Sequence, residues 1–147
     1  MKEIEILDRL INICVDSQKR YEHAASDVGR ADLEQFFKRQ AEARKRAASE
    51  LQRQRIALNG EHKENGSWAG TVDRAAMDLS VVMSMGDSGV VEWCRKDSEE
   101  VLAEYRKALA ANLSPKVREI VEHQRREAEM TMAALEEVLR EYGGPRS

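Results

Sequence analysis

Apolar residues recur at steps of three and four along almost the whole chain, and this helical spacing restricts its fold more than any other feature. In the first segment the spacing brings Ile4, Leu7, Ile11 and Cys14 to one face. Because no proline occurs before Pro115, nothing breaks a long helix over most of the sequence. The spacing predicts long helices over about residues 2–28, 31–58, 88–112 and 115–142, and a shorter helix over about 68–85.

The connections between these segments predict how the helices pair. Gly29 is expected to end the first helix as a C-terminal cap, and Ser114 and Pro115 are typical of a helix start. Helices joined by such short turns pack as antiparallel neighbours, whereas residues 59–87 form a long crossover between the two hairpins. One long crossover between two hairpins is the ferritin-like connectivity. We therefore predict one all-α domain, residues 1–147, folded as a ferritin-like four-helix bundle.

The two halves of the sequence correspond at an offset of 84 residues. Identity at this offset is near chance in most places, but several core positions agree. The shared pattern of core positions and turns therefore indicates two similar hairpins, without showing that the halves are homologous. The matching pairs are Tyr21 with Tyr105, Ala24 with Ala108, Gln40 with Gln124, and Leu51 with Leu135.

The charge pattern bears on partners and location. Charged residues make up 35% of the chain, both signs are mixed, and the net charge is −3, so we expect no nucleic-acid partner. No apolar run approaches the roughly 20 residues of a membrane span, and we expect no membrane partner. The acidic first residues do not fit a signal peptide. We expect a cytoplasmic protein in which Cys14 and Cys94 are reduced and buried.

Four short motifs are spread over nearly the whole chain. They are LINIC at residues 10–14 followed by Tyr21, RQAE at 39–42, GSWAG at 66–70 and YRKAL at 105–109. Together they resemble the bacterial ferritin-like four-helix-bundle proteins assigned to a domain of unknown function. The resemblance implies the same fold and no particular reaction, because that family has no established activity. It also implies a homodimer, since bundles of this class often self-associate.

The histidines argue against a standard di-iron site. Ferritin-like bundles hold two irons with two Glu-x-x-His pairs and two further glutamates. None of His23, His62 and His123 has a glutamate three residues before it. An amide is a weak iron ligand, and a guanidinium is no ligand and repels a cation. We predict no bound metal and no cofactor, because the inward positions carry Gln40, Arg44, Gln124 and Thr131.

These inward polar residues predict a hydrogen-bonded layer across the middle of the bundle. In antiparallel hairpins Tyr105 should lie opposite Gln124, and the remaining members should face one another across the first pair of helices. A buried arginine needs a charged or well-bonded partner, and Asp16, Glu22 and Asp97 all remain candidates for that place. The expected members of the layer are Gln18, Tyr21, Gln40, Arg44, Tyr105 and Gln124.

Two functions fit this sequence. The first is a non-catalytic structural or protein-interaction module, and we favour it because no phosphate-binding loop and no nucleophile motif is present. The alternative is a metal-binding or oxidoreductase protein with an atypical site built from carboxylates alone. The candidate ligands of that site, one from each long helix, are Glu22, Glu42, Asp97 and Glu127.

Overall fold

The computed structural model describes residues 2–59 and 86–143, and within these ranges it contains four α-helices and no strand. The predicted all-α class is confirmed for this part of the chain, and the helix bounds lie within two residues of those expected. The expected crossover and its short helix over about 68–85 lie, apart from residues 59, 86 and 87, outside the described residues. The helices are α1 (Glu3–Asp27), α2 (Ala31–Asn59), α4 (Gly86–Ala110) and α5 (Pro115–Gly143).

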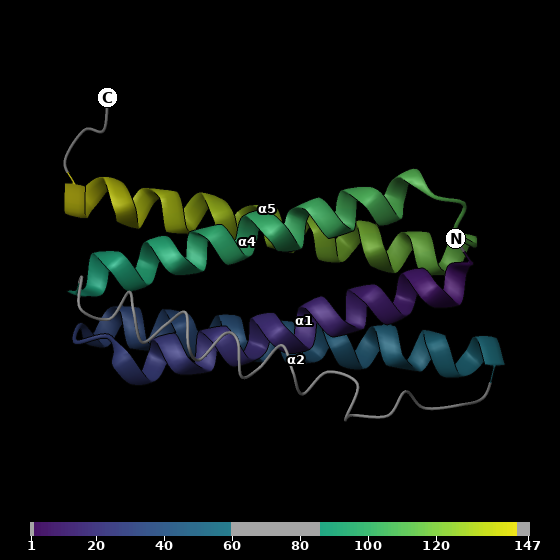
Figure 1. The fold of residues 1–147 in the computed structure, drawn as a ribbon, viewed down its shortest axis with the longest axis horizontal. Helices are drawn as coiled ribbons and strands as arrows, with labels where there is room; N and C mark the ends of the chain where they lie inside the picture. The colour runs from purple at the N-terminus through teal and green to yellow at the C-terminus, as the bar shows by residue number, and fades with distance from the viewer. Residues whose placement is uncertain (1, 60–85, 144–147) are drawn as a thin grey trace.

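The helices form two hairpins that lie side by side (Figure 1). α1 and α2 make the first hairpin and α4 and α5 the second, and the main contact between the hairpins is that of α1 with α4. α2 and α5 touch more sparsely. The N-terminus lies beside the turn between α4 and α5 (Figure 1). Each end of the bundle therefore brings the start of one hairpin next to the turn of the other.

Two hydrophobic clusters fill the bundle. One includes Leu7, at the start of α1, and Leu51, and the other includes Phe37 and Leu135, and all four side chains are fully buried. Burying a leucine or phenylalanine side chain contributes roughly 1.5–3 kcal/mol. Polar side chains lie between and beside the two clusters, and they are buried as deeply as the apolar ones.

The turn between α1 and α2 is held by a carboxylate from the other hairpin. The backbone N–H groups of Gly29 and Arg30 donate to the two carboxylate oxygens of Asp87, at 2.9 Å and 3.1 Å. Asp87 lies in the first turn of α4. The expectation that Gly29 caps α1 is corrected here, because α1 ends at Asp27 and the extended Val28 returns its N–H to the carbonyl of Ala24.

The turn between α4 and α5 is held in the same way. The backbone N–H and the hydroxyl of Ser114 both donate to Oε2 of Glu3, at 2.6 Å and 2.8 Å. Glu3 lies in the first turn of α1. We call these two contacts, made by Asp87 and by Glu3, the cross-hairpin caps. Each satisfies N–H groups at the start of a helix, and those groups have no partner within that helix.

The two hairpins are related by the offset of 84 residues. α2 and α5 cover corresponding positions, and the bounds of α1 and α4 differ by one residue. Asp87 corresponds to Glu3 and Ser114 to Arg30, so the two cross-hairpin caps also correspond. A contact and its counterpart both occur only when the hairpins exchange places by an approximate two-fold rotation. The bundle therefore has internal pseudo-symmetry.

Candidate functional site in the middle of the bundle

A chain of hydrogen bonds crosses the bundle through all four helices. The hydroxyl of Tyr105 donates to Oε1 of Gln124 at 2.7 Å and lies 3.2 Å from the sulfur of Cys14. The amide nitrogen of Gln124 donates to the carbonyl of Ala47 at 3.2 Å and to Oε1 of Glu50 at 2.8 Å. Only Glu50 at the end of this chain is half-buried, so the polar atoms inside are paired with one another rather than with water.

A second set of hydrogen bonds repeats this arrangement in the other half. The hydroxyls of Tyr21 and Ser98 lie 2.9 Å apart, and the hydroxyl of Thr131 donates to Oε1 of Gln40 at 2.8 Å. Both contacts have a counterpart at the offset of 84, so the polar layer follows the pseudo-symmetry. The corresponding contacts are Cys14–Tyr105 with Ser98–Tyr21, and Ala47–Gln124 with Thr131–Gln40.

A charged cluster between α1 and α4 breaks the symmetry. Oδ1 of Asp97 accepts from the guanidinium of Arg20 at 2.7 Å, and Oδ2 accepts from the hydroxyl of Ser17 at 2.6 Å. Arg20 also lies 3.0 Å from the carboxylate of Asp16. Burial works against the charge of Arg20, yet these carboxylates raise its pKa. The cluster is asymmetric because Ile13 and Val101 stand at the positions equivalent to Asp97 and Ser17.

Arg44 is the second buried cation, with only 3% of the residue exposed. Within residues 2–59 and 86–143, no carboxylate oxygen forms an ion pair with it. Burial works against its charge, but Cys14 and the other polar groups around it raise its pKa, so it remains a guanidinium. Two cations, Arg20 and Arg44, thus accompany two buried carboxylates, and the interior stays near neutral.

The predicted layer is therefore placed in parts. Tyr21, Arg44, Tyr105 and Gln124 are buried in the middle of the bundle, and Gln40 reaches it from a half-buried position. Gln18 does not join, because its amide donates to the surface carboxylate of Glu22 at 3.1 Å. Sequence reasoning missed Ser17, Arg20 and Ser98. Only Ser98 had a usable signal, since it stands 84 residues after an inward cysteine.

The thiols and phenols of the layer keep their protons at neutral pH. Burial raises the pKa of the Cys14 thiol, and burial raises that of Cys94 well above 9.0. Burial likewise raises the pKa of Tyr21 and Tyr105 well above 10.0. Since thiolate is the reactive form of cysteine, neither thiol is set up as a nucleophile.

The donor atoms do not fit a di-iron centre. In the described ranges, no three histidine, cysteine, aspartate or glutamate side chains come together as a metal site would require. Asp97 is fully engaged by Arg20 and Ser17, and Glu22 binds Gln18 on the surface. Glu42 and Glu127 line an open groove between α2 and α5. The four carboxylates of the atypical site are therefore not gathered around one point.

The histidines lie away from the layer. His123 is exposed, with Nε2 placed 3.5 Å from Oε1 of Glu127 one turn along the same helix. His23 is half-buried on α1, and His62 lies outside the described residues. No histidine of the described part therefore faces the buried carboxylates, which agrees with the missing Glu-x-x-His spacing.

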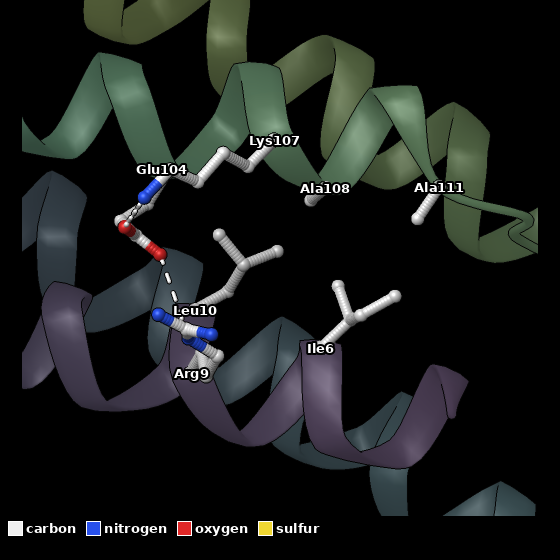
Figure 2. A pocket seen from close by; sticks show the side chains of 7 residues that line it. All are labelled: Ile6, Arg9, Leu10, Glu104, Lys107, Ala108 and Ala111. Carbon is white, nitrogen blue, oxygen red and sulfur yellow. Dashed lines mark hydrogen bonds and ion pairs between the residues drawn. The ribbon is translucent and has the colours of Figure 1, made fainter. Parts of the chain in front are cut away.

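A pocket of about 200 Å³ opens between the start of α1 and the end of α4 (Figure 2). Ile6 and Leu10 project into it from α1, and Ala108 and Ala111 face them from α4 (Figure 2). Its rim is charged. Glu104 lies 3.7 Å from the guanidinium of Arg9 and 3.4 Å from the ammonium of Lys107.

Comparison with known proteins gives a family and no activity. No helix in the described ranges combines the length and the apolar character that crossing a membrane requires. No curated protein matches the chain. A family model described as a domain of unknown function, DUF2383, matches residues 2–111, which is most of the sequence. The chain therefore belongs to the DUF2383 family.

Proposed function

We propose that this protein is a ferritin-like bundle that acts as a non-catalytic structural or protein-interaction module, without a standard di-iron site. The observation that carries the proposal is the buried guanidinium of Arg44 in the middle of the bundle. A fixed positive charge at that depth opposes a divalent or trivalent cation beside it. The nearest buried carboxylates, Asp16 and Asp97, bind Arg20 and are not free to act as ligands.

The hydrogen bonds of the layer support the same role. A buried polar group without a partner costs about 1–3 kcal/mol, so paired groups in a bundle core favour one register of the helices over others. Tyr21 and Tyr105 each bond to the opposite hairpin, to Ser98 and to Cys14. The layer thus serves to hold the two hairpins in register. A homodimer, a cytoplasmic location and the absence of a nucleic-acid partner belong to this proposal.

Metal content tests the proposal against its alternative. The full chain is purified without chelator, analysed for iron, manganese and zinc, and analysed again after aerobic loading with ferrous iron and desalting. We expect far less than one metal per chain in both samples. Because tyrosine ligation and oxidation change the visible spectrum, an unchanged absorbance spectrum after loading is expected as well.

The variant Asp97→Asn provides the matched control. It removes the buried carboxylate of the alternative site and keeps the size of the side chain. Metal at or above one equivalent in the parent chain, lost in Asp97→Asn, would overturn the proposed function and establish the carboxylate site. Metal that binds equally to both proteins would overturn it as well and would place the ligands elsewhere.

A further inference from the structure

The pocket beside Ile6 has a filled counterpart at the other end of α1 and α4. At the offset of 84 residues, the rim residue Arg9 corresponds to Trp93, which is only 9% exposed. Trp93 belongs to one hydrophobic cluster with the counterparts of three apolar residues of the pocket. Those counterparts are Val90, Cys94 and Ala24. The pseudo-symmetry therefore places a buried indole where the pocket stands open.

The size of the pocket points to a single aromatic side chain. Its volume is about 200 Å³, and a dry cavity of about 150 Å³ accepts a benzene molecule. Sites for drug-sized molecules are larger, at roughly 300–1,000 Å³. One phenyl or indole group inserted between the helices matches the volume, and such aromatic residues are common anchors at protein interfaces.

The charge of the rim selects what lies next to that aromatic group. Arg9 and Lys107 share the single carboxylate of Glu104, so the three side chains carry a net positive charge. The charged ends of Arg9 and Glu104 lie at the edge of the pocket and not between its apolar walls (Figure 2). Charge complementarity therefore favours an acidic neighbour and disfavours a basic one.

We propose that this pocket docks a partner protein through one aromatic side chain, a tryptophan or phenylalanine, flanked by acidic residues. The proposal deepens the role as an interaction module and rests on it. The aromatic ring packs against Ile6, Leu10 and Ala108 in the place that Trp93 takes in the other half. The neighbouring carboxylate pairs with Arg9 or Lys107.

Capped tripeptides titrated into the full chain test this proposal. Backbone amide shifts in nitrogen–proton correlation NMR report the binding and its location. We expect Glu-Trp-Glu to bind saturably with a Kd below about 1 mM, with the largest shifts at Leu10 and Ala108. Lys-Trp-Lys and Glu-Ala-Glu should each bind at least tenfold more weakly, because one lacks the matching charge and the other the aromatic ring.

Two variants make the test specific. Arg9→Trp gives position 9 the residue found at position 93, so it should fill the pocket, raise the Tm and weaken Glu-Trp-Glu at least tenfold. Arg126→Trp, on the exposed face of α5, is the matched control and should do neither. Lys107→Glu removes the positive rim without touching the apolar walls. It should reverse the preference towards Lys-Trp-Lys.

Three results would overturn the docking site. They are unchanged binding in Arg9→Trp, shifts that map away from the start of α1, and a homodimer that Arg9→Trp dissociates in sedimentation. In the last case a second copy of this chain is the occupant. None of these results bears on metal content, so a metal-free protein that ignores the peptides refutes the docking site and leaves the proposed function standing.

Discussion

Tyr105 and Tyr21 stand at equivalent positions in the two hairpins, but their hydroxyl groups have different numbers of partners. The hydroxyl of Tyr105 contacts both Cys14 and Gln124, whereas that of Tyr21 contacts Ser98 alone. Both rings are buried almost completely. The pair therefore allows the value of a single buried hydroxyl to be compared in two settings that share the same backbone geometry.

Replacing Tyr105 by phenylalanine should destabilise the protein more than replacing Tyr21. Tyr105→Phe leaves Oε1 of Gln124 buried without a donor, which costs about 1–3 kcal/mol. In Tyr21→Phe the Ser98 hydroxyl loses one partner, and the loss should stay near 1 kcal/mol, the usual net value of one hydrogen bond. Urea unfolding followed by circular dichroism measures both. Equal losses would show that the contact of Tyr105 with Gln124 contributes nothing net.

At the scale of the helices, the cross-hairpin caps explain why both turns are short and ordered. A side-chain cap at a helix start stabilises a protein by about 0.5–2 kcal/mol. The carboxylates of Asp87 and Glu3 also sit at the positive end of a helix dipole, which favours their charge. Unlike an ordinary cap, each comes from the opposite hairpin, so it fixes a turn and joins the hairpins at once.

Removing both caps should destabilise the protein additively. Asp87→Ala and Glu3→Ala should each lower the free energy of unfolding by about 1 kcal/mol, and the double variant by their sum, because the caps lie at opposite ends of the bundle. Asp27→Ala, an exposed carboxylate at the end of α1, is the control and should change little. A double variant that loses clearly more than the sum would mean that the two ends are coupled.

Gly86 begins α4 with φ at 76°, the only positive φ among residues 2–59 and 86–143. Its Gly86→Ala variant should lose about 1–2 kcal/mol, since a Cβ is unfavourable in left-handed backbone. No atom lies within 4 Å of that added Cβ, so the loss would be conformational alone. Gly29→Ala, without positive φ, is the control. Equal Tm values for both variants would contradict the assignment.

The sequence predicted the elements well and the charged cluster poorly. Spacing of apolar residues located the four long helices, because each helix buries one face and the period of that face is local information. Asp97 and Ser17 meet only through the packing of α1 on α4, and nothing local marks that contact. Gln18 was misplaced for a related reason: it lies in the inward stripe by period, but its amide reaches Glu22 on the surface.

For the whole molecule, the buried thiols and phenols predict a loss of stability in base. Burial raises the pKa of Cys94, Tyr21 and Tyr105, so the folded protein holds protons that the unfolded chain releases from about pH 9 upward. The unfolded state then binds fewer protons, and stability falls as pH rises. Below that pH these groups are protonated in both states and contribute no slope.

Urea unfolding between about pH 7 and about pH 11 measures this loss. We expect the free energy of unfolding to fall above about pH 9, and Cys94→Ala to fall less steeply than the parent. The same series in Cys14→Ser, where a hydroxyl replaces the thiol beside Tyr105, separates the second thiol. A profile that stays flat to about pH 11 would show that these side chains ionise in the folded protein.

The pseudo-symmetry has one further consequence, which concerns Arg44. Its counterpart is Ala128, a small buried residue. In a dimer of two identical hairpins, every buried arginine would appear twice near the two-fold axis, and the two like charges would repel in a medium of low dielectric constant. Joining the hairpins in one chain lets the copies differ, so a single guanidinium can be balanced by Asp97, which is also present only once.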